Sequence, residues 1–246
     1  MISVVILVKN EERNIRDCLA SLSFCDEIII VNDNSQDDSP SVARRLGAKV
    51  FDHALDDNFA QARNFGLSKA KGDWVLFIDA DERVSAELAQ EITEAVNERA
   101  DYSGFYLKRT DIFLGRRLKH GETDICLLRL ARRDAGFWLR PVHEYWQVTG
   151  KTAVLTAPLY HYAHTSLADL FVKINFYARI HAKALAAEGK ESSLARIIFY
   201  PPAKFISNWI LKRGFLDGVP GLIMAMSMSL HSFLASAHLY LLTRKR

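Results

Sequence analysis

The sequence predicts an α/β fold with a mostly parallel central sheet, followed by a helical C-terminal region. Strand-like and helix-like segments alternate through the first hundred residues at the spacing of βαβ units. Residues 74–78 are all apolar, which is typical of a strand buried on both faces in a parallel sheet. From Ser166 onward the apolar residues recur at helical spacing.

The composition excludes several classes of protein. With 49% apolar and 25% charged residues, the chain of 246 residues is globular and not disordered. A net charge of +3 is too small for a nucleic-acid footprint over the whole chain, so no nucleic-acid partner is expected. The three cysteines form no pair at zinc-ligand spacing, and the apolar residues 2–8 are too short for a secretory signal. We therefore expect a cytoplasmic protein.

The first hundred residues form a series of alternating elements. Strands are expected at residues 2–8, 27–32, 48–52 and 74–78, and helices at residues 12–23, 40–46, 59–70 and 86–98. Because crossovers between parallel strands are right-handed, the carboxyl ends of the strands meet at one edge of the sheet, where α/β proteins bind ligands.

The residues expected at this edge are polar. They are Lys9, Asn10, Glu11, Asp33, Asn34, Asp79, Asp81 and Glu82. Two carboxylates separated by one residue, as in Asp79 and Asp81, can point at one hard divalent cation, and such cations usually also hold phosphates. The pattern predicts a metal and diphosphate site. A polar turn that caps the next helix is the alternative.

The second half of the chain changes character. Residues 104–109, 124–130 and 152–159 are expected to be strands, and the first two are separated by a basic loop. A helix is expected from Ser166 to Gly189, and Pro201 and Pro202 are expected to break the next one.

The segment 222–242 carries no formal charge, yet its polar residues argue against a transmembrane span. An apolar stripe recurs at spacings of three and four, which predicts an amphipathic helix packed on the domain or lying in a membrane interface. The stripe consists of Ile223, Met226, Leu230, Phe233, Leu234 and Leu241, and the polar residues are Ser227, Ser229, His231, Ser232, Ser236 and His238. With the basic residues 244–246 beside anionic lipid, peripheral membrane contact is expected.

Four segments resemble one family in order and spacing. Residues 4–11, 29–33, 62–66 and 77–82 are similar to the nucleotide-sugar half of family-2 glycosyltransferases, which have the GT-A (Rossmann-like) fold. Residues 129–133, 142–144 and 214–221 further resemble lipopolysaccharide-core β-1,4-glucosyltransferases. The resemblance implies a nucleotide-sugar-binding half at residues 1–100, an acceptor-binding and catalytic-base half at residues 101–165, and a helical C-terminal region at residues 166–246.

The resemblance also implies roles for single residues. Asp81 would be the direct ligand of Mg²⁺ or Mn²⁺, and Asp79 would orient ribose or metal-bound water. Asp33 would accept a hydrogen bond from the uracil ring, and Arg63 would contact the nucleotide. The candidate nucleotide-sugar residues are Val8, Asn10, Glu11, Asp33, Arg63 and Asp79, and the candidate metal residues are Asp81, Asp79 and His161.

The expected catalytic base is Glu144, with His143 beside it. A carboxylate suits proton abstraction from a sugar hydroxyl in a single displacement that inverts the anomeric centre. The family more commonly has Glu-Asp at this position, so the sequence departs from its pattern. His161 and His164 are candidates for a further metal or diphosphate contact.

These expectations combine into one function. The chain is expected to be a metal-dependent, inverting glycosyltransferase that moves a sugar, glucose by resemblance, from a UDP-sugar to a lipid-linked oligosaccharide of the lipopolysaccharide inner core at the cytoplasmic membrane face. Transfer to polyprenyl phosphate or to a protein side chain is an alternative. A non-catalytic nucleotide-sugar-binding membrane scaffold is another, although such a protein need not retain both Asp81 and Glu144.

Overall fold

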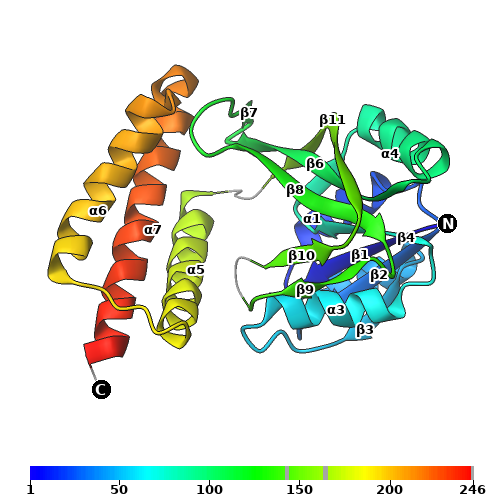
Figure 1. The fold of residues 1–246 in the computed structure, drawn as a ribbon, viewed down its shortest axis with the longest axis horizontal. Coiled ribbons are helices and arrows are strands. Elements are labelled where there is room, and N and C mark those ends of the chain that lie inside the picture. Colours follow the sequence, from blue (N-terminus) through cyan, green and yellow to red (C-terminus); the bar gives the residue numbers. More distant parts are fainter. Residues whose placement is uncertain (142–143, 163–165, 245–246) are drawn as a thin grey trace. The chain divides into compact units, whose positions relative to one another are not determined.

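The computed structural model describes residues 1–141, 144–162 and 166–244. The chain forms two compact units, shown in Figure 1. The sheet unit comprises Met1–Arg109 and Ile125–His161, and the helical unit comprises Thr110–Asp124 and Tyr162–Arg246.

The parallel half of the central sheet has the strand order β3-β2-β1-β4. Its strands are β1 (Ile2–Val8), β2 (Glu27–Asn32), β3 (Lys49–Asp52) and β4 (Trp74–Asp79). The helices between and after them are α1 (Glu12–Ala20), α2 (Ser39–Arg45), α3 (Phe59–Lys69) and α4 (Ala86–Glu98). All eight elements are confirmed, with ends that differ from the expected ones by three residues or fewer.

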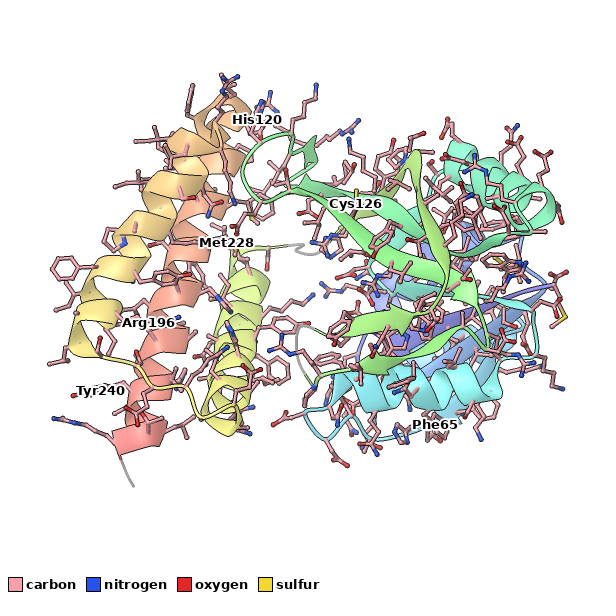
Figure 2. All side chains as sticks on the ribbon, in the orientation of Figure 1. Phe65, His120, Cys126, Arg196, Met228 and Tyr240 are labelled. Carbon is pink, nitrogen blue, oxygen red and sulfur yellow. The ribbon has the colours of Figure 1, made fainter. Side chains whose placement is uncertain are left out.

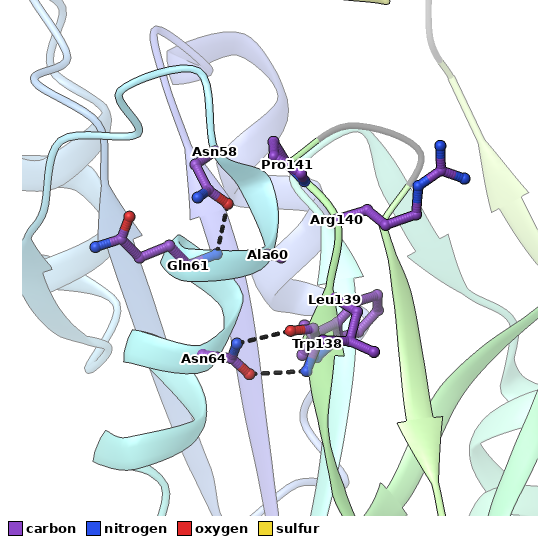
Figure 3. Close-up of a pocket in the computed structure, with 8 residues that line it drawn as sticks. All are labelled: Asn58, Ala60, Gln61, Asn64, Trp138, Leu139, Arg140 and Pro141. Atoms are coloured by element: carbon purple, nitrogen blue, oxygen red, sulfur yellow. Dashed lines mark hydrogen bonds between the residues drawn. The ribbon is translucent and has the colours of Figure 1, made fainter. Parts of the chain in front are cut away.

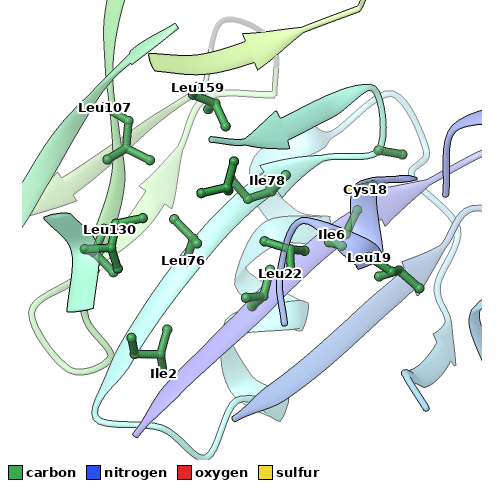
Figure 4. Close-up of a cluster of buried hydrophobic side chains, with 14 of the residues drawn as sticks. Ile2, Ile6, Cys18, Leu19, Leu22, Leu76, Ile78, Leu107, Leu130 and Leu159 are labelled. Carbon is green, nitrogen blue, oxygen red and sulfur yellow. The ribbon is translucent and has the colours of Figure 1, made fainter. Parts of the chain in front are cut away.

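Helices cover both faces of this half, which explains why most residues of β1, β2 and β4 are apolar. Val4 and Ile6 of β1 point into a core with α1, α2 and α4, part of which is drawn in Figure 4. Val5 points to the opposite face and packs under α3. On that side Gly66 lets α3 approach closely, because a Cβ at this position would lie 2.3 Å from Cγ1 of Val5.

The sheet continues past β4 with the strands β8 (Asp124–Arg132), β6 (Tyr102–Phe113), β11 (Lys151–His161) and β5 (Glu82–Val84). β8 runs antiparallel to β4, and the short β5 pairs with the end of β11. The strands β9 (Gly136–Leu139) and β10 (Tyr145–Val148) form a separate antiparallel pair, and β7 (Arg116–Arg117) pairs with β6. The strands β5, β7, β9 and β10 were not predicted, because runs of two to four residues show no clear periodicity.

The helical unit contains α5 (Leu167–Ala187), α6 (Leu194–Ile206), the π-helical turn η1 (Ser207–Leu211), the 3-10 turn η2 (Gly214–Asp217) and α7 (Gly218–Arg244). The expected break at Pro201 and Pro202 is wrong, since α6 continues through both residues. Contact with α7 supports the helix here: Pro201 is buried, and Oγ of Ser229 donates to its carbonyl at 2.8 Å. The irregular turn η1 follows instead.

Helix α7 lies between α5 and α6 (Figure 1), and both neighbours pack against it. The expected separation of a polar and an apolar face is therefore wrong. Ser227, Ser232 and Ser236 are buried between helices, where small side chains allow close packing, whereas Met226 and Phe233 are exposed. In the part of the chain that the structure describes, Gly214–Arg244 alone has the length and composition of a membrane span, and about a third of its most apolar stretch is buried.

Candidate functional site

The register of the parallel strands brings the predicted edge together. Val8 lies opposite Asn32, and Leu7 lies opposite Asp79. The residues that follow these strand ends therefore share one edge of the sheet. The side chain of Val8 is buried, and its carbonyl accepts from the amide of Asp33 at 2.9 Å. The side chain of Val8 is therefore not available to a ligand, and only its main chain could line a ligand site.

Two loops at this edge are tied to each other. The amide of Asn10 donates to Oγ of Ser35, and Oδ1 of Asn10 accepts from the amide of Gln36. The amide of Glu11 donates to Oγ of Ser39. Asn10 has a positive φ of 56°, a conformation that asparagine tolerates better than most residues. The turn after β1 is therefore held against the start of α2.

Asp33 is held between two donors. Its Oδ2 lies 2.7 Å from Nζ of Lys9, and its Oδ1 accepts from the amide of Leu55 at 2.9 Å. Its side chain is largely buried, while Lys9 is more than half exposed. A carboxylate is an acceptor that can receive the N–H of a planar base.

Helix α3 is fixed to strand β9 by its polar residues. Asn58 caps the helix by accepting from the amide of Gln61, and Asn64 exchanges two hydrogen bonds with the backbone of Trp138 (Figure 3). These residues line an open groove of about 300 Å³ that also includes Arg140 and Pro141. The groove contains none of the acidic residues of the sheet edge. Asn64 faces β9, and the preceding residue, Arg63, is buried.

That residue, Arg63, is buried and joins two carboxylates. Its Nη2 donates to Oδ1 of Asp79 at 2.9 Å, and its Nε donates to Oε1 of Glu144 at 3.0 Å. The guanidinium lies 4.7 Å from the ring centroid of Trp138 and 5.8 Å from that of Phe77. The two carboxylates raise the pKa of Arg63 against the effect of burial, so it carries a permanent positive charge.

Asp79 receives a second arginine from the antiparallel half of the sheet. Nη2 of Arg129 donates to Oδ2 of Asp79 at 2.8 Å, and the side chain of Arg129 is 8% exposed. Burial alone would raise the pKa of Asp79, but Arg129 and Arg63 outweigh it and hold that pKa well below its usual range. Asp79 is therefore ionised, and each of its oxygens already accepts from an arginine.

Asp81 lies beside His161 at the end of β11. Oδ1 of Asp81 and Nε2 of His161 are 3.6 Å apart, and both side chains are mostly buried. The pairing of β5 with β11, in which His161 lies opposite Glu82, sets this distance. An oxygen and an imidazole nitrogen so placed are suitable donors for one Mn²⁺ or Mg²⁺. Among residues 1–141, 144–162 and 166–244, no group of three His, Cys, Asp or Glu residues could hold a metal.

Glu82 supports the turn between these acidic residues. Its Oε2 accepts from the amide of Asp79 at 2.9 Å, and the side chain is fully buried. Burial and the charge of Asp79 raise the pKa of Glu82. Its role is structural, because it holds the backbone between β4 and β5, the turn that contains Asp81.

The structure brings the predicted residues together in three groups. Arg63, Asp79 and Glu144 form one, Asp81 and His161 the second, and Asp33 with the Asn10–Glu11 turn the third. The expected contributions of His143 and His164 fall outside the described residues. Arg129 was not predicted as a site residue, although it lies in residues 129–133, one of the segments that resemble the family.

Comparison with known proteins shows the family of this chain. The model of the family described as glycosyl transferase family 2 matches residues 3–140, more than half of the chain. The chain belongs to glycosyl transferase family 2. The matched residues include the three strand ends, Arg63, Asp79, Asp81 and Arg129.

Relatives extend the likeness over the whole chain. An uncharacterized glycosyltransferase of Rickettsia typhi is 30% identical, covering 99% of this chain and 88% of the relative. The lipopolysaccharide core biosynthesis glycosyltransferase LpsC of Rhizobium meliloti is 27% identical, covering 97% of this chain and 92% of the relative.

Solved structures share the fold. The structure of S. aureus TarS 1-349 has a TM-score of 0.53 at 16% identity, and the match covers 99% of this chain and 91% of that one. Family-2 membership and this likeness establish the GT-A fold that the sequence motifs predicted.

Proposed function

We propose that this family-2 glycosyltransferase transfers a sugar from a UDP-sugar to a lipid-linked acceptor, with a divalent metal ion and with inversion of the anomeric centre. The observation that supports the proposal most is the Arg63 bridge between Asp79 and Glu144. Through this bridge, the sheet edge that would bind the donor is connected with Glu144, the carboxylate best placed to activate an acceptor.

The donor side rests on the sheet edge. Asp33, with its carboxylate ordered by Lys9 and the amide of Leu55, would accept from the uracil ring. The backbone around Val8, Asn10 and Glu11 would line the nucleotide. A related fold supports the choice of nucleotide, because the TarS fragment was also solved in complex with UDP, with a TM-score of 0.52. Asp79, fixed by two arginines, would order the ribose or a metal-bound water.

The metal would be held by Asp81 and His161. Mg²⁺ or Mn²⁺ at this place supplies neutralisation of the charge that develops on the leaving diphosphate. Two protein donors suffice, since Mg²⁺ commonly takes one or two carboxylates and completes its shell with substrate phosphates and water. Asp79 is less suited to direct ligation, because both of its oxygens are engaged by arginines.

Glu144 would act as the base. Its side chain is 17% exposed, and its Oε1 accepts from Nε of Arg63. The hydrogen bond from Arg63 fixes the direction of the Glu144 carboxylate, so that Oε2 can take the proton of the acceptor hydroxyl. Loss of that proton makes the oxygen nucleophilic at the moment of attack on the anomeric carbon.

The acceptor is proposed from the relatives. LpsC carries the name of a lipopolysaccharide core glycosyltransferase and matches nearly the full length of both chains. Transfer of glucose to the inner core at the cytoplasmic face of the membrane is the reaction that we propose.

The deciding experiment is a donor screen that measures UDP release by the purified protein with and without Mn²⁺, using lipopolysaccharide from core mutants as acceptor. Release that requires one UDP-sugar, the metal and one truncated core supports the proposal. UDP release with polyprenyl phosphate or with a protein as acceptor would show that this molecule, and not the lipopolysaccharide core, is the acceptor. Binding of UDP-sugar without turnover on any acceptor would favour a non-catalytic role.

A further inference from the structure

Helix α6 has two faces with different surroundings. One face packs on α7, where Pro201 is buried and Asn208, just past the helix, is buried as well. The opposite face carries an exposed apolar row that continues into η1 and is here called the α6 ridge. It consists of Ala195, Phe199, Pro202, Ala203, Ile206 and Ile210.

The α6 ridge follows helical spacing. Phe199, Ile206 and Ile210 are separated by seven and four residues, and their exposed fractions are 69%, 47% and 54%. The smaller members between them are also exposed, and none of the six is charged. The exposed apolar residues continue with Leu211 at the end of η1 and with Phe215 and Leu216 in η2. A contiguous apolar surface of this kind marks a site of interaction with a protein or a membrane.

The charge of the helical unit favours a membrane. It holds fourteen Lys and Arg against seven Asp and Glu, a net charge of +7, whereas the sheet unit carries −4 of the chain's +3 total. Arg196, labelled in Figure 2, lies at the N-terminal end of the α6 ridge, and Lys212 and Arg213 follow its C-terminal end. All three basic side chains belong to exposed residues.

Acidic side chains near the C-terminal end are engaged within the unit. Glu122 pairs with Lys204 and Lys212, and Asp217 accepts from the amides of Lys119 and His120. An apolar row with cations at both ends is complementary to a bilayer whose headgroups are anionic, because acyl chains receive the row and lipid phosphates receive the cations.

We propose that the α6 ridge is the surface through which this protein binds an anionic lipid bilayer, with α6 lying in the plane of the interface. The proposal deepens the proposed function, on which it rests for the idea of a membrane-bound acceptor. It moves the contact from α7, where the sequence had placed it. Ile223, Leu230 and Leu234 of that predicted stripe pack on Phe113 and Leu170 inside the helical unit and are not free to enter lipid.

The test is flotation of the full chain with vesicles of phosphatidylcholine alone and of phosphatidylcholine mixed with phosphatidylglycerol. Wild type is expected to float with the mixed vesicles and to release in high salt. Replacing Phe199, Ile206 and Ile210 by Ser is expected to lower the bound fraction about tenfold or more. The matched control is Met226→Ser with Val172→Ser, two exposed apolar residues on α7 and α5, which should leave flotation unchanged.

Two further measurements keep the test decisive. Circular dichroism and UDP binding show whether the triple variant is folded, and Arg196→Glu with Arg213→Glu weakens binding without touching the α6 ridge. Wild-type protein that stays unbound with both vesicles, or a folded triple variant that floats like wild type, overturns the proposal. A ridge variant that floats normally but changes from dimer to monomer by light scattering shows an interface between copies instead. Because flotation needs no turnover, its outcome is independent of the donor screen.

Discussion

Nε of Arg63 lies 3.0 Å from Oε1 of Glu144, although 81 residues separate the two in the chain. The same guanidinium reaches Asp79 through Nη2 and is covered by Trp138. A buried arginine in this position acts on the site through the carboxylates that it holds. Its planar donors suit two acceptors in fixed directions, which a lysine cannot reproduce.

Arg63→Lys should therefore lower kcat by about tenfold or more and leave the KM for the donor within a factor of about three, since misplacement of catalytic groups reduces the rate of the chemical step. Arg63→Gln should lower kcat further, because the variant has no positive charge beside Glu144 at this position and leaves Asp79 with Arg129 alone. Steady-state kinetics with a UDP-release assay measures the difference, and Arg99→Lys at an exposed helix end serves as the control. A large rise in KM with unchanged kcat would show direct nucleotide contact instead.

Asp81→Asn is expected to abolish metal-dependent turnover and metal-dependent UDP binding while the fold survives. The amide keeps the size of the side chain but loses the charge that a hard cation requires. Calorimetric titration of UDP with and without Mn²⁺ measures the effect, and Asp101→Asn, an exposed surface carboxylate, is the control. Turnover comparable to wild type at saturating Mn²⁺ would contradict the metal role.

Glu144→Gln should reduce the chemical step by about 10²-fold or more and leave UDP-sugar affinity near the wild-type value, as expected for loss of a general base. Single-turnover kinetics separates the chemical step from binding. Glu94→Gln, on the exposed face of α4, is the matched control. If the Gln variant keeps its rate and a His143 variant loses it, the base is His143.

Glu27 should make stability dependent on pH. Burial alone would raise its pKa, but hydrogen bonds from Lys49, Ser3 and the amide of Lys71 outweigh it and hold the pKa below its usual range. A lowered pKa in the folded state stabilises the protein above the unfolded pKa, about 4.3, and this contribution is lost as pH falls through the lower folded value.

Glu27→Gln is therefore expected to cost about 1–3 kcal/mol at pH 7, the typical cost of disrupting a buried charged hydrogen-bond network. Urea unfolding of wild type and variant at several pH values measures the difference, which should shrink below about pH 4. A difference that is the same at pH 7 and at pH 3 would mean that the charge of Glu27 contributes nothing.

Gly66→Ala should destabilise the sheet unit by about 1–3 kcal/mol, because the added methyl group would overlap Val5 and push α3 off the sheet. Thermal unfolding measures the loss. Val5→Ala removes the atom that the methyl group meets, so the double variant should lose less than the sum of the two single variants. If the losses of unfolding free energy in the two single variants add up in the double variant, the methyl group does not clash with Val5.

The sequence predicted the parallel half of the fold well for a physical reason. Most positions in strands covered on both faces are apolar, and α4 begins directly after Ser85, whose Oγ accepts from the amide of Leu88. Short strands such as β5 and β9 depend on pairing with β11 and β10, which lie elsewhere in the chain. The close approach at Gly136, where a Cβ would lie 1.8 Å from the carbonyl oxygen of Gln147, has no local signal.

The arrangement of residues at the sheet edge was predictable to the same degree. The acidic strand ends follow from the pattern, and so does their meeting at one edge. The pairing of Arg129 with Asp79 depends on the antiparallel register in which Leu130 lies opposite Leu76, a relation between segments more than fifty residues apart. The buried serines of α7 likewise depend on helices α5 and α6, which a single helical pattern does not contain.

The division of the chain also has a consequence for how the protein is made. Thr110–Asp124 belongs to the helical unit, although the residues on both sides of it belong to the sheet unit. His120 of this segment finds its partner Asp217 only 97 residues later. At the usual rate of translation that interval lasts about 5 to 20 s. During this time Phe113 and Leu118 leave the ribosome before the α5 and α7 residues that cover them have been synthesised. A nascent chain stalled in this interval would present these two side chains to chaperones and to other unfinished chains.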